Sequence, residues 1–231
     1  RWFAPPFGGQ VFSGLLLDAF DAMAAGPVGP RLVPPDQPID LMVTVTDFTG
    51  HAETMRLNSP PEVMETEHRL IFSFRQEPGM EQELDDAPGL AFAARATASF
   101  PGAFPVFTVN ELDRVLARRR RAWPERDGFL RRQLNEDDLS SCESRILVDG
   151  SVLANAPFRP ALGVLRQRPA RREVDRRFVY VDPSPSKRDG RRLANGKPAR
   201  LPGFFSTIFK SISDIPREQP IRDNLEAIDR H

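Results

Sequence analysis

Stretches with the period-two pattern of β-strands alternate along this chain with stretches that have helical spacing. Branched and aromatic residues dominate residues 40–48 (DLMVTVTDF) and 68–74 (HRLIFSF), which is typical of strands. Residues 89–99 (GLAFAARATAS) and 110–123 instead place apolar or small residues at helical spacing, which favours helices. Strand-helix alternation of this kind predicts a three-layer α/β domain.

Further elements extend this alternation. Ser13 precedes residues 15–24 (LLLDAFDAMA) and is the expected N-cap of a helix there. Residues 144–148 (SRILV) and 177–181 (RFVYV) are predicted strands, with a helix after Ala156 between them.

The predicted organisation has three parts. Residues 1–182 are expected to form the α/β domain, and residues 183–200 (PSPSKRDGRRLANGKPAR) a flexible basic loop. Residues 201–231 carry two short helical patterns, split by Pro216 and Pro220, and are expected to begin a helical extension.

Composition excludes several classes of function. Lysine and arginine number 32, as do aspartate and glutamate, so the net charge is zero and no nucleic-acid partner is predicted. The sequence contains neither a GxxxxGK[ST] nor a GxGxxG motif, so no nucleotide cofactor is expected. It contains no run of 18 apolar residues, so no membrane-spanning helix is expected.

Cysteine and histidine give little support for metal or thiol chemistry. Cys142 is the only cysteine, which favours a reducing, cytoplasmic setting and an inert or surface thiol. His51, His68 and His231 have no cysteine or glutamate partner at metal-ligand spacing. Surface or strand-edge positions are therefore expected for the histidines, and no metal is predicted.

The stretch ILVDGSVLANAPF at residues 146–158 admits two interpretations. Asp149 follows an apolar run and is followed at once by Gly150. An Asp-Gly pair commonly closes a strand in a turn. A carboxylate at a strand end is also where α/β folds place their active sites. The residues of this stretch alone leave both interpretations open.

Three segments, in order, carry a resemblance to a known family: VTVTDFTG at 43–50, ARATASFPGAFPVF at 94–107 and VDGSVLANAP at 148–157. Together they resemble the patatin-like phospholipases, and the tail resembles the C-terminal extension of a bacterial subgroup. The resemblance implies a three-layer α/β/α sheet domain with a helical C-terminal extension. It also implies a lipid acyl hydrolase of the phospholipase A type, which uses a Ser-Asp dyad on lipid esters and needs no cofactor.

The same resemblance assigns roles at the third segment. Asp149 would be the dyad's base, and Gly150, Ser151 and Asn155 would support its turn. The family's nucleophile lies in a Gly-x-Ser-x-Gly elbow, which this sequence lacks. We therefore expect the nucleophilic serine upstream of Arg1, in a longer chain of which this is an N-terminally incomplete copy. The alternative is a non-catalytic scaffold or interaction protein with the same fold.

Residues 111–142 form an insertion relative to many family members. Leu112, Val115 and Leu116 give it an apolar stripe, and arginines 118–121 with Arg131 and Arg132 give it positive charge. One interpretation is peripheral contact with an anionic membrane, where each arginine contributes on the order of 1 kcal/mol. The other is a solvated helix whose arginines pair with the acidic residues at 81–86.

Overall fold

The computed structural model describes the chain over a set of ranges, to which every structural statement here refers. These are residues 8–27, 29–30, 33–34, 37–56, 58, 61–77, 84, 86–153, 158–166, 168, 170, 173–179 and 181. Asn155 lies outside them, as do the predicted basic loop at 183–200 and the predicted helical extension at 201–231.

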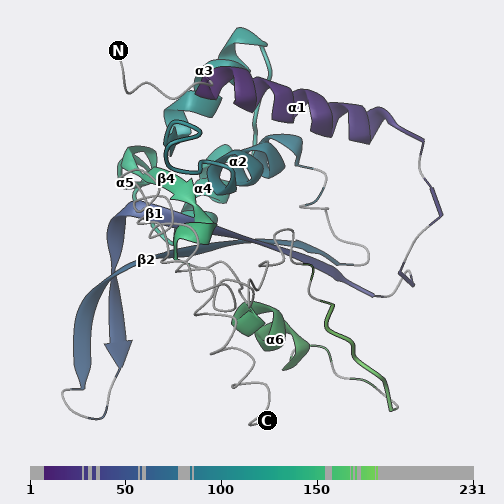
Figure 1. Ribbon diagram of the computed structural model, residues 1–231, viewed down its shortest axis with the longest axis vertical. Helices are drawn as coiled ribbons and strands as arrows, with labels where there is room; N and C mark the ends of the chain where they lie inside the picture. The colour runs from purple at the N-terminus through teal and green to yellow at the C-terminus, as the bar shows by residue number, and fades with distance from the viewer. Residues whose placement is uncertain are drawn as a thin grey trace, which may run out of the picture.

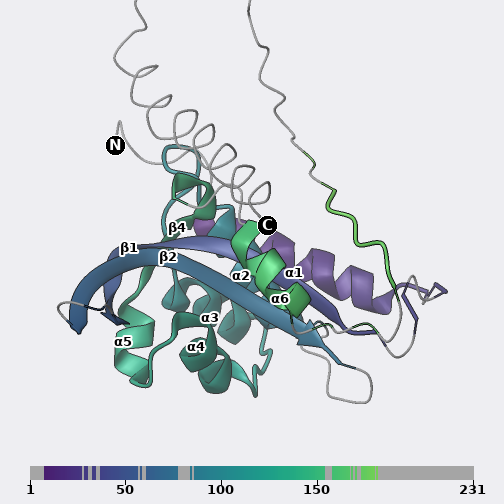
Figure 2. The same cartoon turned by 90° about the horizontal axis from the view of Figure 1, so that it is seen from below.

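A four-stranded antiparallel sheet forms the centre of the fold, in the order β2-β1-β4-β3. Strands β1 (Ile39–Arg56) and β2 (Glu62–Gln76) make a long curved hairpin, visible in Figure 2. The shorter strand β4 (Ile146–Asp149) pairs with β1, and β3 (Phe107–Thr108) pairs with β4. The mixed α/β class is therefore confirmed.

More of the labelled helices lie on one side of this sheet than on the other (Figure 1). Helix α2 (Ala87–Thr97) packs on β1 and β4, and α4 (Arg126–Leu134) packs on β2. Helix α1 (Gly9–Ala25) lies on α2 and on α3 (Val109–Arg118), while α5 (Leu139–Ser144) lies on α3 and α4. A short 3-10 turn, η2 (Gly150–Val152), follows β4, and α6 (Phe158–Arg166) lies on the opposite side of the sheet from α1 and α2.

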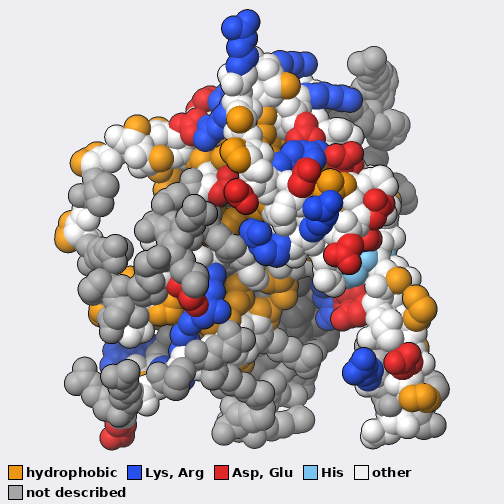
Figure 3. All heavy atoms as spheres, turned by 180° about the vertical axis from the view of Figure 1, so that it is seen from behind, with side chains coloured by type: hydrophobic (Ala, Val, Ile, Leu, Met, Phe, Trp, Pro, Cys, Tyr) orange, Lys and Arg blue, Asp and Glu red, His pale blue; other side chains and the backbone are white. Residues whose placement is uncertain are grey.

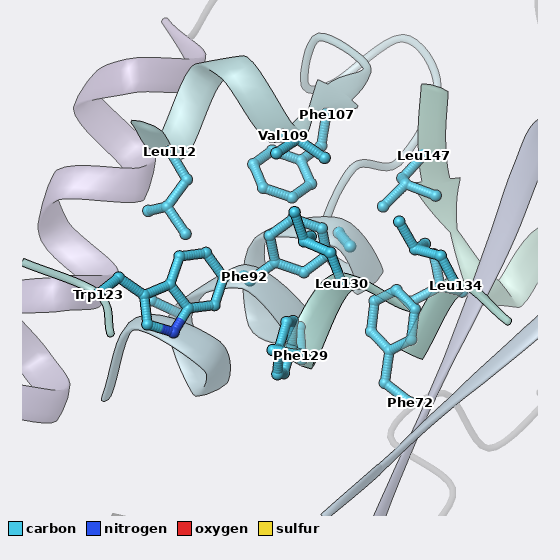
Figure 4. Packing of buried hydrophobic residues seen from close by; sticks show 14 of the residues in the cluster. Phe72, Phe92, Phe107, Val109, Leu112, Trp123, Phe129, Leu130, Leu134 and Leu147 are labelled. Carbon is cyan, nitrogen blue, oxygen red and sulfur yellow. The ribbon is translucent and has the colours of Figure 1, made fainter. Parts of the chain in front are cut away.

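Aromatic side chains fill the space between the sheet and the helices (Figure 4). Phe92 of α2 is fully buried at their centre, with its ring 4.9 Å from that of Phe107 and 5.5 Å from that of Phe129. Phe72 and Trp123 pack on other sides of it. The strand pattern supplies this core because alternate residues of β2, including Leu70 and Phe72, face the helices.

The inserted segment is part of this core. Leu112, Val115 and Leu116 are at most 5% exposed and pack in the same cluster as Phe92. The interpretation in which this stripe faces lipid does not hold, because these side chains are already buried in the core. Gln133 of α4 also caps the outer edge of β2, donating to the Ser73 carbonyl and accepting from its amide, both at 2.8 Å.

Two predicted boundaries differ from the structure. Helix α1 begins at Gly9 with Gly8 as N-cap, so Ser13 lies inside the helix and does not cap it. Strand β1 does not end at Gly50 but continues to Arg56 across a shift of register between Thr46 and His51, where Gly50 has a positive φ of 75°.

The predicted strand at 177–181 is wrong for the residues that the structure describes there. Residues 177–179 and 181 have no strand conformation. Phe178 and Val179 are 46% and 84% exposed. An apolar run becomes a strand only where a sheet edge is available to pair with it.

Candidate active site

Asp149 is the last residue of β4 and lies opposite Val45 of β1. The residue is half-buried, and its Oδ1 accepts a hydrogen bond of 2.7 Å from the Ser151 amide. No hydrogen bond to its Oδ2 is present in the described part of the chain. One carboxylate oxygen is thus fixed by the turn, while the other is available to a reacting group.

The backbone of Asp149 is held from two other elements. Its amide donates to the carbonyl oxygen of Ser99, just past the end of α2, at 3.2 Å. Its own carbonyl oxygen accepts from Thr46 Oγ1 of β1 at 3.1 Å. Helix α2, strand β1 and the turn η2 therefore fix this residue together.

The neighbouring turn residues have distinct positions. Gly150 is buried, and a Cβ atom there would overlap the backbone of Thr44, so the close approach of β1 requires glycine. The Ser151 hydroxyl is buried without a hydrogen-bond partner among the described residues. Asp149, Gly150 and Ser151 thus lie in one turn, whereas Asn155 lies outside the described residues.

A buried arginine of α2, which contacts the candidate site through Ser99, was missed by the sequence analysis. The Arg95 side chain is fully buried, and its Nε donates to Glu111 at 2.9 Å. Ser13 of α1 donates to the same carboxylate at 2.7 Å. The guanidinium also lies 5.6 Å from the ring centre of Phe12 and 5.3 Å from that of Phe107. A lone arginine within a helix of small residues is the sequence signal that points to this network.

Asp47, from the first of the three resembling segments, has a structural role. It is fully buried and pairs with Arg145. Its Oδ1 accepts from the amide and the hydroxyl of Thr49 at 3.0 and 2.6 Å. These bonds occupy the carboxylate, so Asp47 is not a second acid at the site.

Two half-buried histidines flank Asp47, and His68 lies on the edge strand β2, one of the positions expected for the histidines. His68 Nδ1 is 2.8 Å from the Asp47 carbonyl oxygen, and His51 Nδ1 is buried 3.8 Å from its carboxylate. No group of three or more His, Cys, Asp or Glu side chains in the described residues could hold a metal ion.

The described serine and cysteine groups considered as nucleophiles have structural roles. Ser13 and Ser99 are fully buried and hydrogen-bonded, Ser13 to Glu111 and Ser99 to the carbonyl oxygen of Arg95. Cys142 is buried, and desolvation raises the pKa of its thiol, which makes it an inert rather than a surface thiol.

The arginine run makes its described contacts with α1. Of the acidic residues at 81–86, only Asp86 is among the described residues, and it accepts from Trp123 at 3.1 Å rather than from the run. Arg119 donates to Asp18 at 2.6 and 3.0 Å, and this bond lowers the pKa of Asp18. Arg121 binds Asp21, and Arg118 donates to Gln10 at 2.7 Å. Figure 3 shows basic and acidic side chains interspersed over the part of one face that is not drawn in grey.

Replacing arginines 118–121 with glutamine is expected to leave co-sedimentation with anionic liposomes unchanged, because Arg119 and Arg121 are already paired with aspartates. The measurement compares the intact chain and this variant on liposomes with and without anionic lipid. Sedimentation of the intact chain alone, and only with anionic lipid, would contradict this expectation.

A shallow groove of about 330 Å³ lies between α1 and α3, away from the Asp149 turn. Val11 and Leu15 of α1 line one side, and Val115 and Arg118 line the other. No residue of η2 or β4 contributes to it. The groove is therefore not an acyl-chain pocket at Asp149.

Comparisons with known proteins neither support nor contradict the resemblance seen in the sequence. No protein family, no curated protein and no solved structure matches this chain. In addition, none of the described helices combines the length and the apolar character needed to span a membrane.

Proposed function

We propose that this chain is part of a lipid acyl hydrolase in which Asp149 is the base of a Ser-Asp dyad. The observation that carries the proposal is the Asp149 carboxylate, held at the end of β4 by Oδ1 while Oδ2 receives no bond from the described residues. The three segments resembling patatin-like phospholipases support it. The proposal includes a cytoplasmic enzyme that meets lipid esters at a membrane surface.

The fold supports the same proposal in outline. Helices α1 and α2 lie on one side of the sheet and α6 on the other, an arrangement compatible with three α/β/α layers. The nucleophilic serine is proposed on a Gly-x-Ser-x-Gly segment preceding Arg1, since the 231 residues contain no such motif.

In this mechanism the serine Oγ forms a bond to the ester carbonyl carbon while its proton passes to Asp149 Oδ2. The carbonyl electrons move to the oxygen. When the C=O bond re-forms, the bond to the alcohol breaks and the alcohol takes the proton from Asp149. Water then attacks the acyl-enzyme in the same way, with Asp149 again accepting and returning a proton.

The second candidate function is a non-catalytic scaffold with the same fold. The location of the groove favours it, because the groove lies between α1 and α3 and not beside Asp149. The hydrolase remains our conclusion because the resemblance places the dyad base at Asp149, where Oδ2 receives no hydrogen bond from the described residues.

A fluorophosphonate probe, which reacts with activated serines, tests the proposal. The chain from Arg1 to His231 is expected to remain unlabelled, because Ser13 and Ser99 are buried and bonded and the Ser151 hydroxyl is buried. A longer natural chain that includes the proposed Gly-x-Ser-x-Gly segment is expected to carry one label, on the serine of that segment. Peptide mass spectrometry locates the label.

Two outcomes would contradict the proposal, the first its placement of the nucleophile and the second its catalytic function. Stoichiometric labelling of Ser13, Ser99 or Ser151 would show that the nucleophile is not on an upstream segment. Absence of labelling in the natural chain, with its thermal unfolding transition intact, would favour the scaffold.

A further inference from the structure

The hydrogen bonds of Arg95 extend beyond those that neutralise its charge. Glu111 already pairs with the guanidinium, through Nε at 2.9 Å and Nη2 at 3.3 Å. The remaining bonds run to the segment that follows α2: Nη1 donates to Ser99 Oγ at 2.5 Å, and Nη2 donates to the Pro105 carbonyl oxygen at 3.1 Å. Arg95 thus fixes both ends of the turn between α2 and β3.

Ser99 connects this arginine to the candidate active site. Its hydroxyl donates back to the Arg95 carbonyl oxygen at 2.8 Å, so the hydroxyl is bonded on both sides. Its own carbonyl oxygen accepts from the Asp149 amide at 3.2 Å. Ser99 is fully buried, so its carbonyl oxygen is a fixed contact that helps to hold the backbone of Asp149, together with Thr46 of β1.

We propose that Arg95, acting through Ser99, is a positioning residue that sets the place of the Asp149 carboxylate. This inference rests on the function proposed above. Neither Arg95 nor Ser99 touches the reacting atoms. A displacement of the carboxylate by about 1 Å can lower a rate ~100-fold. Loss of the Arg95–Ser99 hydrogen bond is therefore expected to lower kcat and to leave KM unchanged.

The test uses Ser99→Ala in the natural chain with its upstream segment, assayed on a soluble ester. Ser99→Ala removes the bond from Arg95 and keeps the Ser99 carbonyl, so kcat is expected to fall ~10- to 100-fold with KM unchanged. Arg95→Lys, which keeps the charge opposite Glu111 but not the fork of donors, is the second variant and is expected to behave alike. Ser144→Ala is the matched control, since the Ser144 hydroxyl also bonds a backbone carbonyl near a helix end but lies on α5.

A double variant separates positioning from a general loss of structure. In an Asp149→Asn background, Ser99→Ala is expected to cause no further loss in the residual rate, because the carboxylate it positions is gone. An equal loss in both backgrounds would overturn the inference, as would a Ser99→Ala kcat within twofold of the parent. If Asp149→Asn itself has no effect, the proposed function fails, and the positioning role fails with it.

Discussion

Replacing Asp149 with asparagine in the natural chain, with its upstream segment, is expected to lower ester hydrolysis by more than about 10⁴-fold. Asparagine keeps the size of aspartate, and its Oδ1 can still accept from the Ser151 amide. It cannot take a proton from the attacking serine, and such losses exceed the usual contribution of acid-base catalysis. The measurement is kcat/KM on a soluble ester, with thermal unfolding recorded for both proteins.

Asp138→Asn is the matched control. Asp138 also accepts backbone amide bonds at the start of a short helix, from Ser140 and Ser141, but lies at the surface on α5. The same chemical change there is expected to leave kcat/KM unaltered. Activity of the Asp149 variant within tenfold of the parent would remove Asp149 from the dyad.

Phe92→Ala is expected to destabilise the protein by about 3–5 kcal/mol, a typical cost for removing a buried phenyl ring. Phe92 is fully buried, and its ring packs against Phe72, Phe107, Trp123 and Phe129. Alanine would leave a cavity between the sheet and the inserted segment. Equilibrium unfolding in urea measures the change.

Phe48→Ala provides the comparison for this effect. Phe48 is 66% exposed on β1, so the same truncation is expected to change the free energy of unfolding by about 0.5 kcal/mol or less. A loss below 1 kcal/mol for Phe92→Ala would mean that the aromatic cluster is not the core of this fold.

The pattern of apolar residues within a few neighbouring positions was sufficient to predict the two long strands and the helix of small residues. Residues 40–48 and 68–74 lie in β1 and β2, and residues 89–99 largely in α2, as predicted. The extension of β1 beyond Gly50 was not predicted because a register shift depends on the partner strand, and glycine alone indicates only a turn. The burial of Leu112, Val115 and Leu116 could not be predicted, because an apolar stripe does not indicate which part of the chain covers it. In the structure they belong to the same core cluster as the sheet residues.

The candidate site shows the same division between local and long-range information. The position of Asp149 at a strand end followed from its neighbours in sequence. The network of Arg95, Ser99 and Glu111 did not, because its side chains come from separate elements and meet only in the folded chain. The partners of the arginine run could not be predicted from neighbouring residues either, since Arg119 and Asp18 are 101 residues apart in the sequence.

The distance between the nucleophilic serine Oγ and Asp149 Oδ2 tests the proposed dyad most directly. It can be measured in a crystal structure of the natural chain that includes the Gly-x-Ser-x-Gly segment. We expect the two oxygens within about 2.6–3.2 Å of each other, with Asp149 Oδ1 still bound to the Ser151 amide. A serine hydroxyl bonded to another base, with Asp149 Oδ2 out of its reach, would contradict the dyad.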